Sequence, residues 1–176
     1  MHGDLINALE FKATDKTFKT VVMGEDMHIR DRRWQKEPLT ITIKFKSPRI
    51  NNRAAVAVDH IDLIAGKITG KIDPASADYT KATNETTKVI ATFTKKDWRT
   101  DRDGYKVVTY RIRDLDNSTY FRLRGTNLAV NTPYETDAAG NPLSDFLATD
   151  NLGLDGAPEA WADLWFYSNP IFVYLD

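Results

Sequence analysis

The chain contains no cysteine, which excludes disulfide bonds, thiolate catalysis and zinc sites built on cysteine. Histidine is also scarce. Its three residues include no pair with the H-x-H or H-x-x-x-H spacing of a metal site. We therefore expect this chain to hold no zinc.

An excess of charge of either sign is equally lacking, because 24 Lys and Arg nearly balance 25 Asp and Glu. This balance argues against a dedicated nucleic-acid-binding protein and against a polybasic membrane anchor. No apolar run approaches the roughly 18 residues of a membrane-spanning helix. Residues 1–4 lack the basic and apolar regions of a signal peptide, and they suggest the cut edge of a longer protein. We expect no nucleic-acid partner and no membrane insertion.

Alternation of apolar and polar residues is the clearest pattern that is present. It predicts half-buried strands over residues 39–46, 106–113 and 119–124. The residues predicted to point into the core are Leu39, Ile41, Ile43, Phe45, Val108, Tyr110, Ile112, Phe121 and Leu123. Further strands are predicted at 5–11, 18–23, 89–93 and 171–175.

The stretch 55–65 is less regular, because Val56 and Val58 share a phase that Ile61 and Leu63 break. A bulge near Asp59 would restore one buried face. The alternative is a central strand that is buried on both faces. With turns between the strands, the pattern predicts one all-β domain over residues 1–176, an antiparallel sandwich of the immunoglobulin-like or jelly-roll-like kind.

Two segments depart from this pattern. Residues 125–157 show no strand, so a long irregular loop is predicted there. Residues 158–165 begin with proline and place Trp161, Leu164 and Trp165 at helical spacing, which predicts one short helix near the C-terminus. We expect Trp165 to pack internally and at least one neighbouring aromatic residue to stay partly exposed.

No residue is predicted to be catalytic. His60 lies between Asp59 and Asp62 and could form a catalytic Asp–His pair, but a structural histidine is the simpler interpretation. Ser168 lies outside any G-x-S-x-G motif and precedes Asn-Pro, as a turn residue would.

Two arginines on one strand face are the stronger candidates for ligand binding. Arg122 and Arg124 are predicted to project outward, and Asn127 follows them. Two guanidinium groups on one face can grip a carboxylate or a phosphate. The alternative is a solvated face whose arginines pair with Asp or Glu across the sheet. His60 is included among these candidate ligand-binding residues.

Oxygen ligands around a glycine suggest a second kind of site. Asp137, Asn141 and Asp145 lie at i, i+4 and i+8 around Gly140, and calcium prefers oxygen ligands. The segment lacks the alternation and closing Glu of an EF-hand loop, so an ordinary acidic turn is the alternative.

Four segments together resemble a known family. The residues are His2–Ile6, Asp59–Ile64, Tyr120–Asn127 and Leu164–Val173. They resemble the C-terminal region of bacterial PHP-type metallohydrolases (the polymerase and histidinol phosphatase superfamily), and the resemblance covers most of the chain. In that group a Gly-Asp-Leu-Ile segment follows the metal-binding domain, and the tail often closes with a strand of the form [Ser/Thr]-Asn-Pro-Ile-[Phe/Tyr]-Val. The most specific parts are Arg122–Asn127 and Tyr167–Val173.

The resemblance implies a position rather than an activity. The family's metal site, for zinc, manganese or iron, uses residues of a preceding barrel-like domain that starts with an H-x-H motif. No such motif occurs here. The resemblance therefore implies a non-catalytic accessory domain that packs on the catalytic domain of a metal-dependent phosphoesterase. It also implies a secreted or cell-surface bacterial parent, although the residues themselves leave a cytoplasmic location open.

Three hypotheses follow from the sequence. The first is this accessory domain. The second is an independent binding module for a carbohydrate or an anionic ligand, which would use the long loop and the Arg122/Arg124 face. The third is a small hydrolase centred on His60. A metal assay separates the third from the others, since the first two predict no phosphatase turnover with added Mn²⁺ or Zn²⁺.

Overall fold

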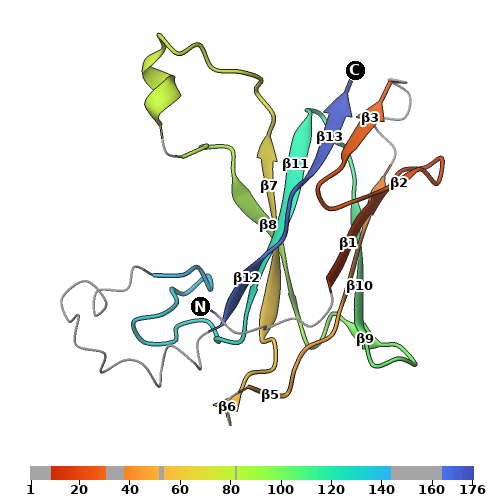
Figure 1. The fold of residues 1–176 in the computed structure, drawn as a ribbon, viewed down its shortest axis with the longest axis vertical. Coiled ribbons are helices and arrows are strands. Elements are labelled where there is room, and N and C mark those ends of the chain that lie inside the picture. Colours follow the sequence, from red (N-terminus) through yellow and green to blue (C-terminus); the bar gives the residue numbers. More distant parts are fainter. Residues whose placement is uncertain (1–8, 31–37, 52–53, 82, 144–163) are drawn as a thin grey trace.

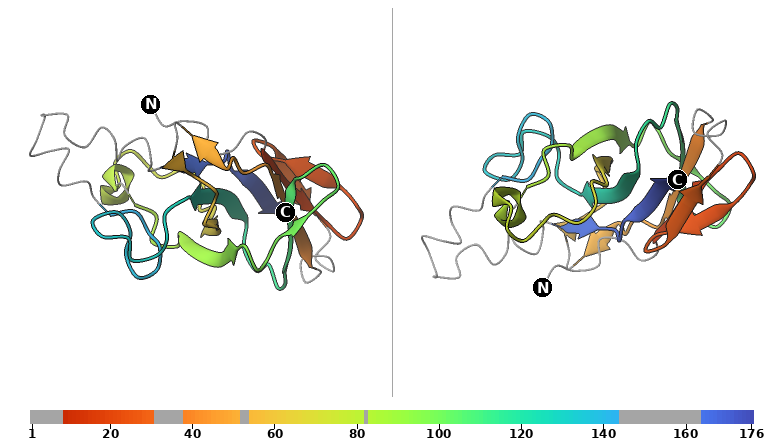
Figure 2. Two further views of the ribbon diagram at one scale, coloured as in Figure 1. Left: turned by 90° about the horizontal axis from the view of Figure 1, so that it is seen from below. Right: turned by 90° about the horizontal axis from the view of Figure 1, so that it is seen from above.

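A computed structural model describes residues 9–30, 38–51, 54–81, 83–143 and 164–176. Its strands form two sheets that pack face to face (Figures 1 and 2). The predicted β-sandwich is therefore confirmed. Helix in the described ranges is confined to the 3₁₀ turn η1 (Ala77–Thr80), so none of it is long and apolar enough to cross a membrane.

The first sheet has five strands, and every neighbouring pair in it is antiparallel. Its spatial order is β2 (Thr20–Val22), β1 (Leu9–Thr14), β4 (Leu39–Phe45), β10 (Lys106–Ile112) and β9 (Arg99–Thr100).

The second sheet has six strands. Its main order is β3 (Asp26–Ile29), β13 (Ile171–Leu175), β11 (Thr119–Thr126), β7 (His60–Lys67) and β8 (Lys88–Thr94). The sixth strand, β12 (Trp165–Tyr167), pairs with the second half of β11. The pair of β13 and β3 is parallel, which the sequence pattern did not predict. A small separate hairpin joins β5 (Ile50–Asn51) and β6 (Ala54–Ala55).

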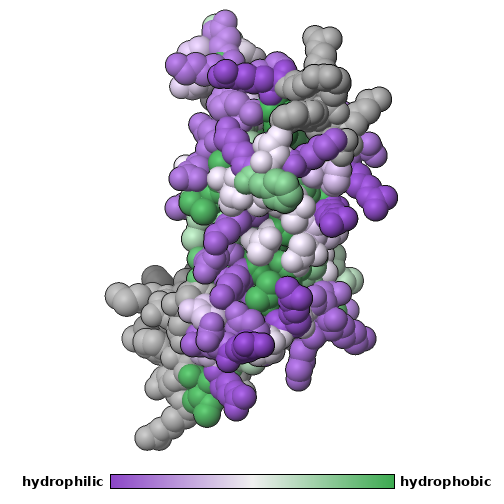
Figure 3. All heavy atoms as spheres, turned by 90° about the vertical axis from the view of Figure 1, so that its right-hand side faces the viewer, coloured by the Kyte–Doolittle hydropathy of each residue, from purple (hydrophilic) through white to green (hydrophobic). Residues whose placement is uncertain are grey.

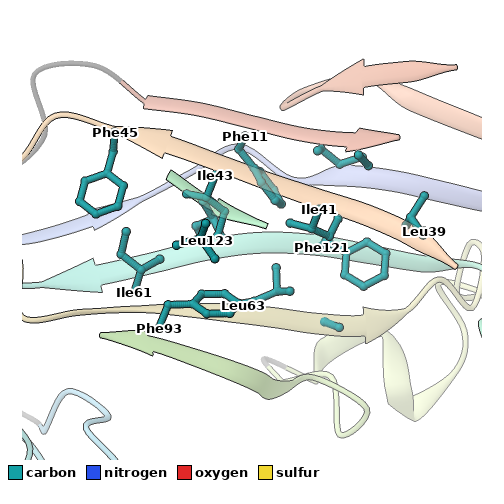
Figure 4. Close-up of a cluster of buried hydrophobic side chains, with 14 of the residues drawn as sticks. Phe11, Leu39, Ile41, Ile43, Phe45, Ile61, Leu63, Phe93, Phe121 and Leu123 are labelled. Atoms are coloured by element: carbon teal, nitrogen blue, oxygen red, sulfur yellow. The ribbon is translucent and has the colours of Figure 1, made fainter. Parts of the chain in front are cut away.

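The hydrophobic core lies between the two sheets. Figure 4 shows side chains of β1 and β4 meeting those of β7, β8 and β11. Seven of the nine residues predicted to point inward are buried, whereas Tyr110 and Ile112 are half-buried. Both lie on β10, which has only the two-residue strand β9 on its outer side. A strand near the sheet edge is covered less completely than a central one.

The central strand β7 supports the second interpretation of residues 55–65. Its residues from His60 to Gly66 are buried on both faces of the sheet. The predicted bulge near Asp59 is wrong. The irregularity lies further along, where Leu63 faces Ala91 and Ile64 faces Val89, so that β8 carries one extra residue.

The C-terminal segment differs from the predicted helix. Trp165 is the first residue of β12, so the helix does not extend to it. Residues 158–163 lie outside the described residues. Trp165, Phe166 and Phe172 are all half-buried, which confirms that aromatic neighbours stay partly exposed but not that Trp165 is fully internal. Trp161 falls in the undescribed range.

Strands β12 and β13 act as two halves of one strand along the same side of β11. Between them Ser168 donates its N–H to the carbonyl of Leu123 at 3.0 Å and accepts the N–H of Leu123 on its Oγ at 2.8 Å. The hydroxyl oxygen thus replaces a strand carbonyl where Pro170 interrupts the ladder. Ser168 is therefore a buried structural residue in the link between the two strands, and it continues the ladder where a turn residue was predicted.

The side of the molecule that carries β1, β2 and β9 is mostly hydrophilic (Figure 3). Apolar groups appear there only as small patches between polar ones. On the opposite side two segments project from the six-stranded sheet: the connection between β7 and β8, and the loop 128–143 (Figures 1 and 2). That outer face is therefore the more distinctive surface of the fold.

An exposed aromatic residue ends the β1–β2 hairpin. Phe18 is 89% exposed and has a φ of 66°, in the left-handed region that aromatic residues rarely adopt. The carboxylate of Asp15 holds the turn by accepting the backbone N–H groups of Thr17 at 2.8 Å and Lys19 at 3.0 Å. The side chain of Phe18 therefore contributes little to stability, while its backbone is strained.

Replacing Phe18 with glycine should raise the free energy of unfolding by about 1 kcal/mol, because glycine has no Cβ to clash in this conformation. Urea denaturation would measure the change. The same substitution at Lys19, where φ is not positive, should lower stability. A loss of stability in Phe18→Gly equal to that in Lys19→Gly would contradict the proposed strain.

Candidate functional site

The outer face of the six-stranded sheet carries most of the buried polar side chains. His60 and Asp62 on β7 alternate with core residues, as do Arg124 and Thr126 on β11. The register places Arg124 opposite Asp62 and Thr126 opposite His60. All four side chains are therefore directed away from the core and lie beneath or beside the loop 128–143.

Arg124 does not project into solvent as predicted. It is 8% exposed, and its Nε and Nη2 both donate to Oδ2 of Asp62, which is itself only 1% exposed. The hydroxyl of Thr92 donates to the other carboxylate oxygen at 2.7 Å. The alternative prediction, pairing with an acid across the sheet, is confirmed for Arg124. The solvated setting was wrong because the loop 128–143 covers the pair.

The loop 128–143 reaches this pair through Asn141, whose Oδ1 accepts from Arg124 Nη2 at 2.9 Å. Asp137 holds Asn141 in turn, since one carboxylate oxygen accepts the Asn141 backbone N–H at 2.8 Å and the other accepts its Nδ2 at 2.9 Å. These hydrogen bonds, with help from the nearby Arg124 charge, lower the pKa of Asp137. A continuous polar chain therefore links Asp62, Arg124, Asn141 and Asp137.

Two of the predicted calcium ligands thus have protein donors on their oxygens. Asp137 and Asn141 lie together, while Asp145 lies outside the described residues. Within the described ranges, no three His, Asp or Glu side chains are grouped so that they could hold a metal ion. The calcium site stays a prediction. Calcium would compete with the hydrogen bonds that the side-chain oxygens of Asp137 and Asn141 now accept.

The melting temperature should therefore be the same in millimolar Ca²⁺ and in EDTA, because the described residues offer no free cluster of oxygen ligands to bind the ion. Differential scanning calorimetry would measure it. Asp137→Ala should lower the melting temperature equally in both buffers. A rise with Ca²⁺ in the wild type that disappears in Asp137→Ala would show that calcium binds here after all.

His60 is buried under the same loop. It is 2% exposed, and its Nδ1 lies 2.9 Å from a carboxylate oxygen of Asp59. Its Nε2 has no hydrogen-bond partner among the described residues. Gly140, with a φ of +77°, packs so closely that a Cβ there would lie 3.0 Å from Nε2. The imidazole of His60 is thus covered by the loop, whereas the side chain of Asp59 is 43% exposed.

Asn127 has a structural role at the end of β11. Its Oδ1 accepts the backbone N–H of Leu164 at 2.8 Å, and the hydroxyl of Thr126 donates to the carbonyl of Leu164 at 2.9 Å. Both bonds fix the chain just before β12. The predicted ligand-binding role of Asn127 therefore stays a prediction, with its Oδ1 already occupied.

Arg122 is a predicted site residue whose N–H donors make no hydrogen bond to the described residues. The structure gives it no hydrogen bond or ion pair within the described ranges, and its Nε is buried without a partner. Its guanidinium carbon lies 5.2 Å from the centre of the Tyr167 ring, within the range of a cation–π contact. Arg122 and Arg124 were predicted to act together, but Arg124 is paired with Asp62 whereas Arg122 contacts the ring of Tyr167.

Several aromatic side chains share this face of the sheet with Arg122. Tyr120 and Phe172 are neighbours, with ring centres 6.5 Å apart. Tyr174 stacks on His28 at 4.9 Å, and Tyr167 is 52% exposed. We call these residues the aromatic row, and its members are Tyr120, Tyr167, Phe172 and Tyr174, with Arg122 between Tyr120 and Tyr167.

A glycine explains how one ring of the aromatic row lies on the sheet. Gly66 faces Tyr120 across the β7–β11 pair, and a Cβ on Gly66 would lie 2.6 Å from the tyrosine ring. The ring therefore extends across β7, and its hydroxyl hydrogen-bonds to the hydroxyl of Thr87. No pattern in the sequence indicates this contact, because it depends on the register of two distant strands.

The fold and this face together define a β-sandwich with a capped polar network and an aromatic row beside it. No family model matches the chain, and no curated protein matches it in sequence. The resemblance to PHP-type metallohydrolases therefore rests on the residues of the chain alone.

Proposed function

We propose that this chain is a non-catalytic binding module that binds carbohydrate on the outer face of its six-stranded sheet. The observation that carries the proposal is the aromatic row, in which Tyr120 is spread over Gly66 and Tyr167 stays half-exposed. The weakly positive C–H groups of a sugar ring pack well on the negative face of an aromatic ring. Neighbouring hydroxyl and guanidinium groups supply polar contacts for sugar hydroxyls.

The arrangement of the outer face also supports carbohydrate over a small compact ligand. Tyr167 on β12 pairs with Arg124 on β11. Arg124 is four positions from Tyr120, which corresponds to about 13 Å along the strand backbone. Aromatic side chains attached at that spacing along one sheet suit an extended chain with several sugar units. The segments that flank this face at its two ends would limit where such a chain lies (Figure 1).

Isothermal titration calorimetry with soluble polysaccharides, both neutral and acidic, tests the proposal. At least one should bind, and Tyr167→Ala should weaken it about tenfold through loss of a stacking surface. Phe18→Ala is the control, because Phe18 is 89% exposed in the turn between β1 and β2 of the five-stranded sheet and lies outside the aromatic row. Equal binding by wild type and Tyr167→Ala, or no binding at all, would refute the proposal.

A second proposal is that the module serves as the accessory domain of a PHP-type phosphoesterase at the cell surface or outside the cell. One structural observation favours it. Three of the four resembling segments, far apart in sequence, overlap β7, β11, β12 and β13, which belong to one sheet. The resemblance therefore converges on one surface region. The isolated chain should hydrolyse no phosphate ester with added Mn²⁺ or Zn²⁺, and turnover that depends on His60 would contradict this proposal.

A further inference from the structure

We propose that Arg122 makes the aromatic row selective for carbohydrate that carries carboxylate groups, that is, for a polyuronate. This inference rests on the carbohydrate-binding function proposed above and adds the chemical class of the ligand.

The first argument is the unused hydrogen-bonding capacity of Arg122. Its Nε is cut off from solvent and has no acceptor, although a buried donor without a partner is unfavourable. Its remaining nitrogens also have no protein acceptor within the described ranges, and the side chain is only partly buried. Because Nε is closed to solvent, a ligand would bind the terminal Nη1 and Nη2 nitrogens, whose planar pair matches the two oxygens of a carboxylate.

The contrast with Arg124 sharpens the argument. Two residues further along the same strand, Arg124 has Asp62 as a counter-ion and Asn141 as a second acceptor. Among the described residues, the fold thus neutralises the guanidinium of Arg124 and leaves that of Arg122 in contact with the ring of Tyr167 but without an acceptor. No described ion pair involves Arg122, so its positive charge stays available to a ligand on this face.

The position of Arg122 ties this charge to the carbohydrate surface. It lies between Tyr120 on its own strand and Tyr167 on β12, and its contact with Tyr167 holds the guanidinium against an aromatic ring. A sugar unit that stacks on either ring would place a substituent near Arg122. A carboxylate on that unit would form charge-assisted hydrogen bonds, whereas a methyl ester could not bind as an anion.

The acidic side chains on this sheet do not oppose such a ligand at Arg122. Asp62 is paired with Arg124, and Asp59 with His60. At the β3 edge of the sheet, Asp176 contacts His28, and Asp26 of β3 pairs with Phe172 of β13. These last two carboxylates would disfavour a polyuronate that extends to the β3 edge, so we expect the chain to lie toward β12.

Titration calorimetry at low ionic strength can separate charge recognition from stacking. The probes are polygalacturonate and the same polymer after full methyl esterification, which differ in carboxylate charge. Wild-type protein should bind polygalacturonate about tenfold more tightly, as expected for one charge-assisted pair. Arg122→Gln should bind both polymers equally, and Arg122→Lys should recover only part of the preference. Added salt should reduce the preference.

Arg111→Gln is the matched control, because Arg111 is exposed on the five-stranded sheet and should leave the preference unchanged. A preference that survives in Arg122→Gln would overturn this inference while leaving the carbohydrate-binding function intact. Equal or tighter binding of dextran sulfate would overturn the selectivity for carboxylate in favour of any polyanion. Failure of every polymer to bind would refute the binding function itself.

Discussion

Replacing Asp62 with alanine should lower the free energy of unfolding by about 3–5 kcal/mol, the usual cost of removing one partner of a buried ion pair. The loss is large because Arg124 would remain 8% exposed with its charge uncompensated. Thr92 would also lose its acceptor, and the guanidinium of Arg124 would keep the hydrogen bond to Asn141 and the ring of Trp165 but no counter-ion among the described residues. Urea denaturation followed by fluorescence would measure the effect.

A double variant distinguishes a stranded charge from simple loss of packing. Asp62→Leu combined with Arg124→Met removes both charges and replaces them with apolar volume, which is often neutral or stabilising for buried pairs. The double variant should therefore be more stable than Asp62→Ala. A double variant that is less stable than Asp62→Ala would show that the loss comes from packing and not from a stranded charge. If Asp62→Ala costs under about 1 kcal/mol, the ion pair contributes little to stability.

The extent to which the sequence predicted this region depends on the range of the interactions. The β4 strand was predicted well because its core face is set by local alternation from Leu39 to Phe45. Asp62 could have been noticed as an acid within a buried strand, which requires a partner. Its partner Arg124 could not be assigned, because pairing depends on the register of β7 with β11.

The burial of Arg124 depends on an even longer connection. Alternation placed it correctly on the face away from the core, but solvent exposure of that face is decided by a loop that follows β11. Asn141 and Gly140 bring that loop down onto Arg124 and His60. A periodic pattern reports which face a side chain is on, and it contains no information about what covers that face.

Strand β12 was missed for a related reason. Trp161, Leu164 and Trp165 fit a helical spacing, yet Trp165 to Tyr167 pair with Arg124 to Thr126. Short apolar segments do not distinguish helix from strand by periodicity alone. The hydrogen bonds that Asn127 and Thr126 make with Leu164 decide the outcome, because they fix where the returning chain meets β11.

Replacing Phe121 with alanine should also lower the free energy of unfolding by about 3–5 kcal/mol, because it leaves a cavity at the centre of the sandwich. Phe121 is 1% exposed on β11, between strands β7 and β13, and faces the side chains of β4 across the two sheets (Figure 4). Neighbours on three strands would have to move to fill the space, and close-packed sheets allow little of that movement.

The chain offers an exact chemical control for this substitution. Phe18→Ala removes the same atoms from a side chain that is 89% exposed, so it creates no cavity and should change stability by less than about 0.5 kcal/mol. Alanine has a Cβ, so the strain at φ 66° stays and does not confuse the comparison. The difference between the two variants in urea denaturation therefore measures the burial of Phe121 between the sheets. Similar stability losses in both variants would contradict a core in that position, and with it the packing that holds Arg122 and the aromatic row on the outer face of β11.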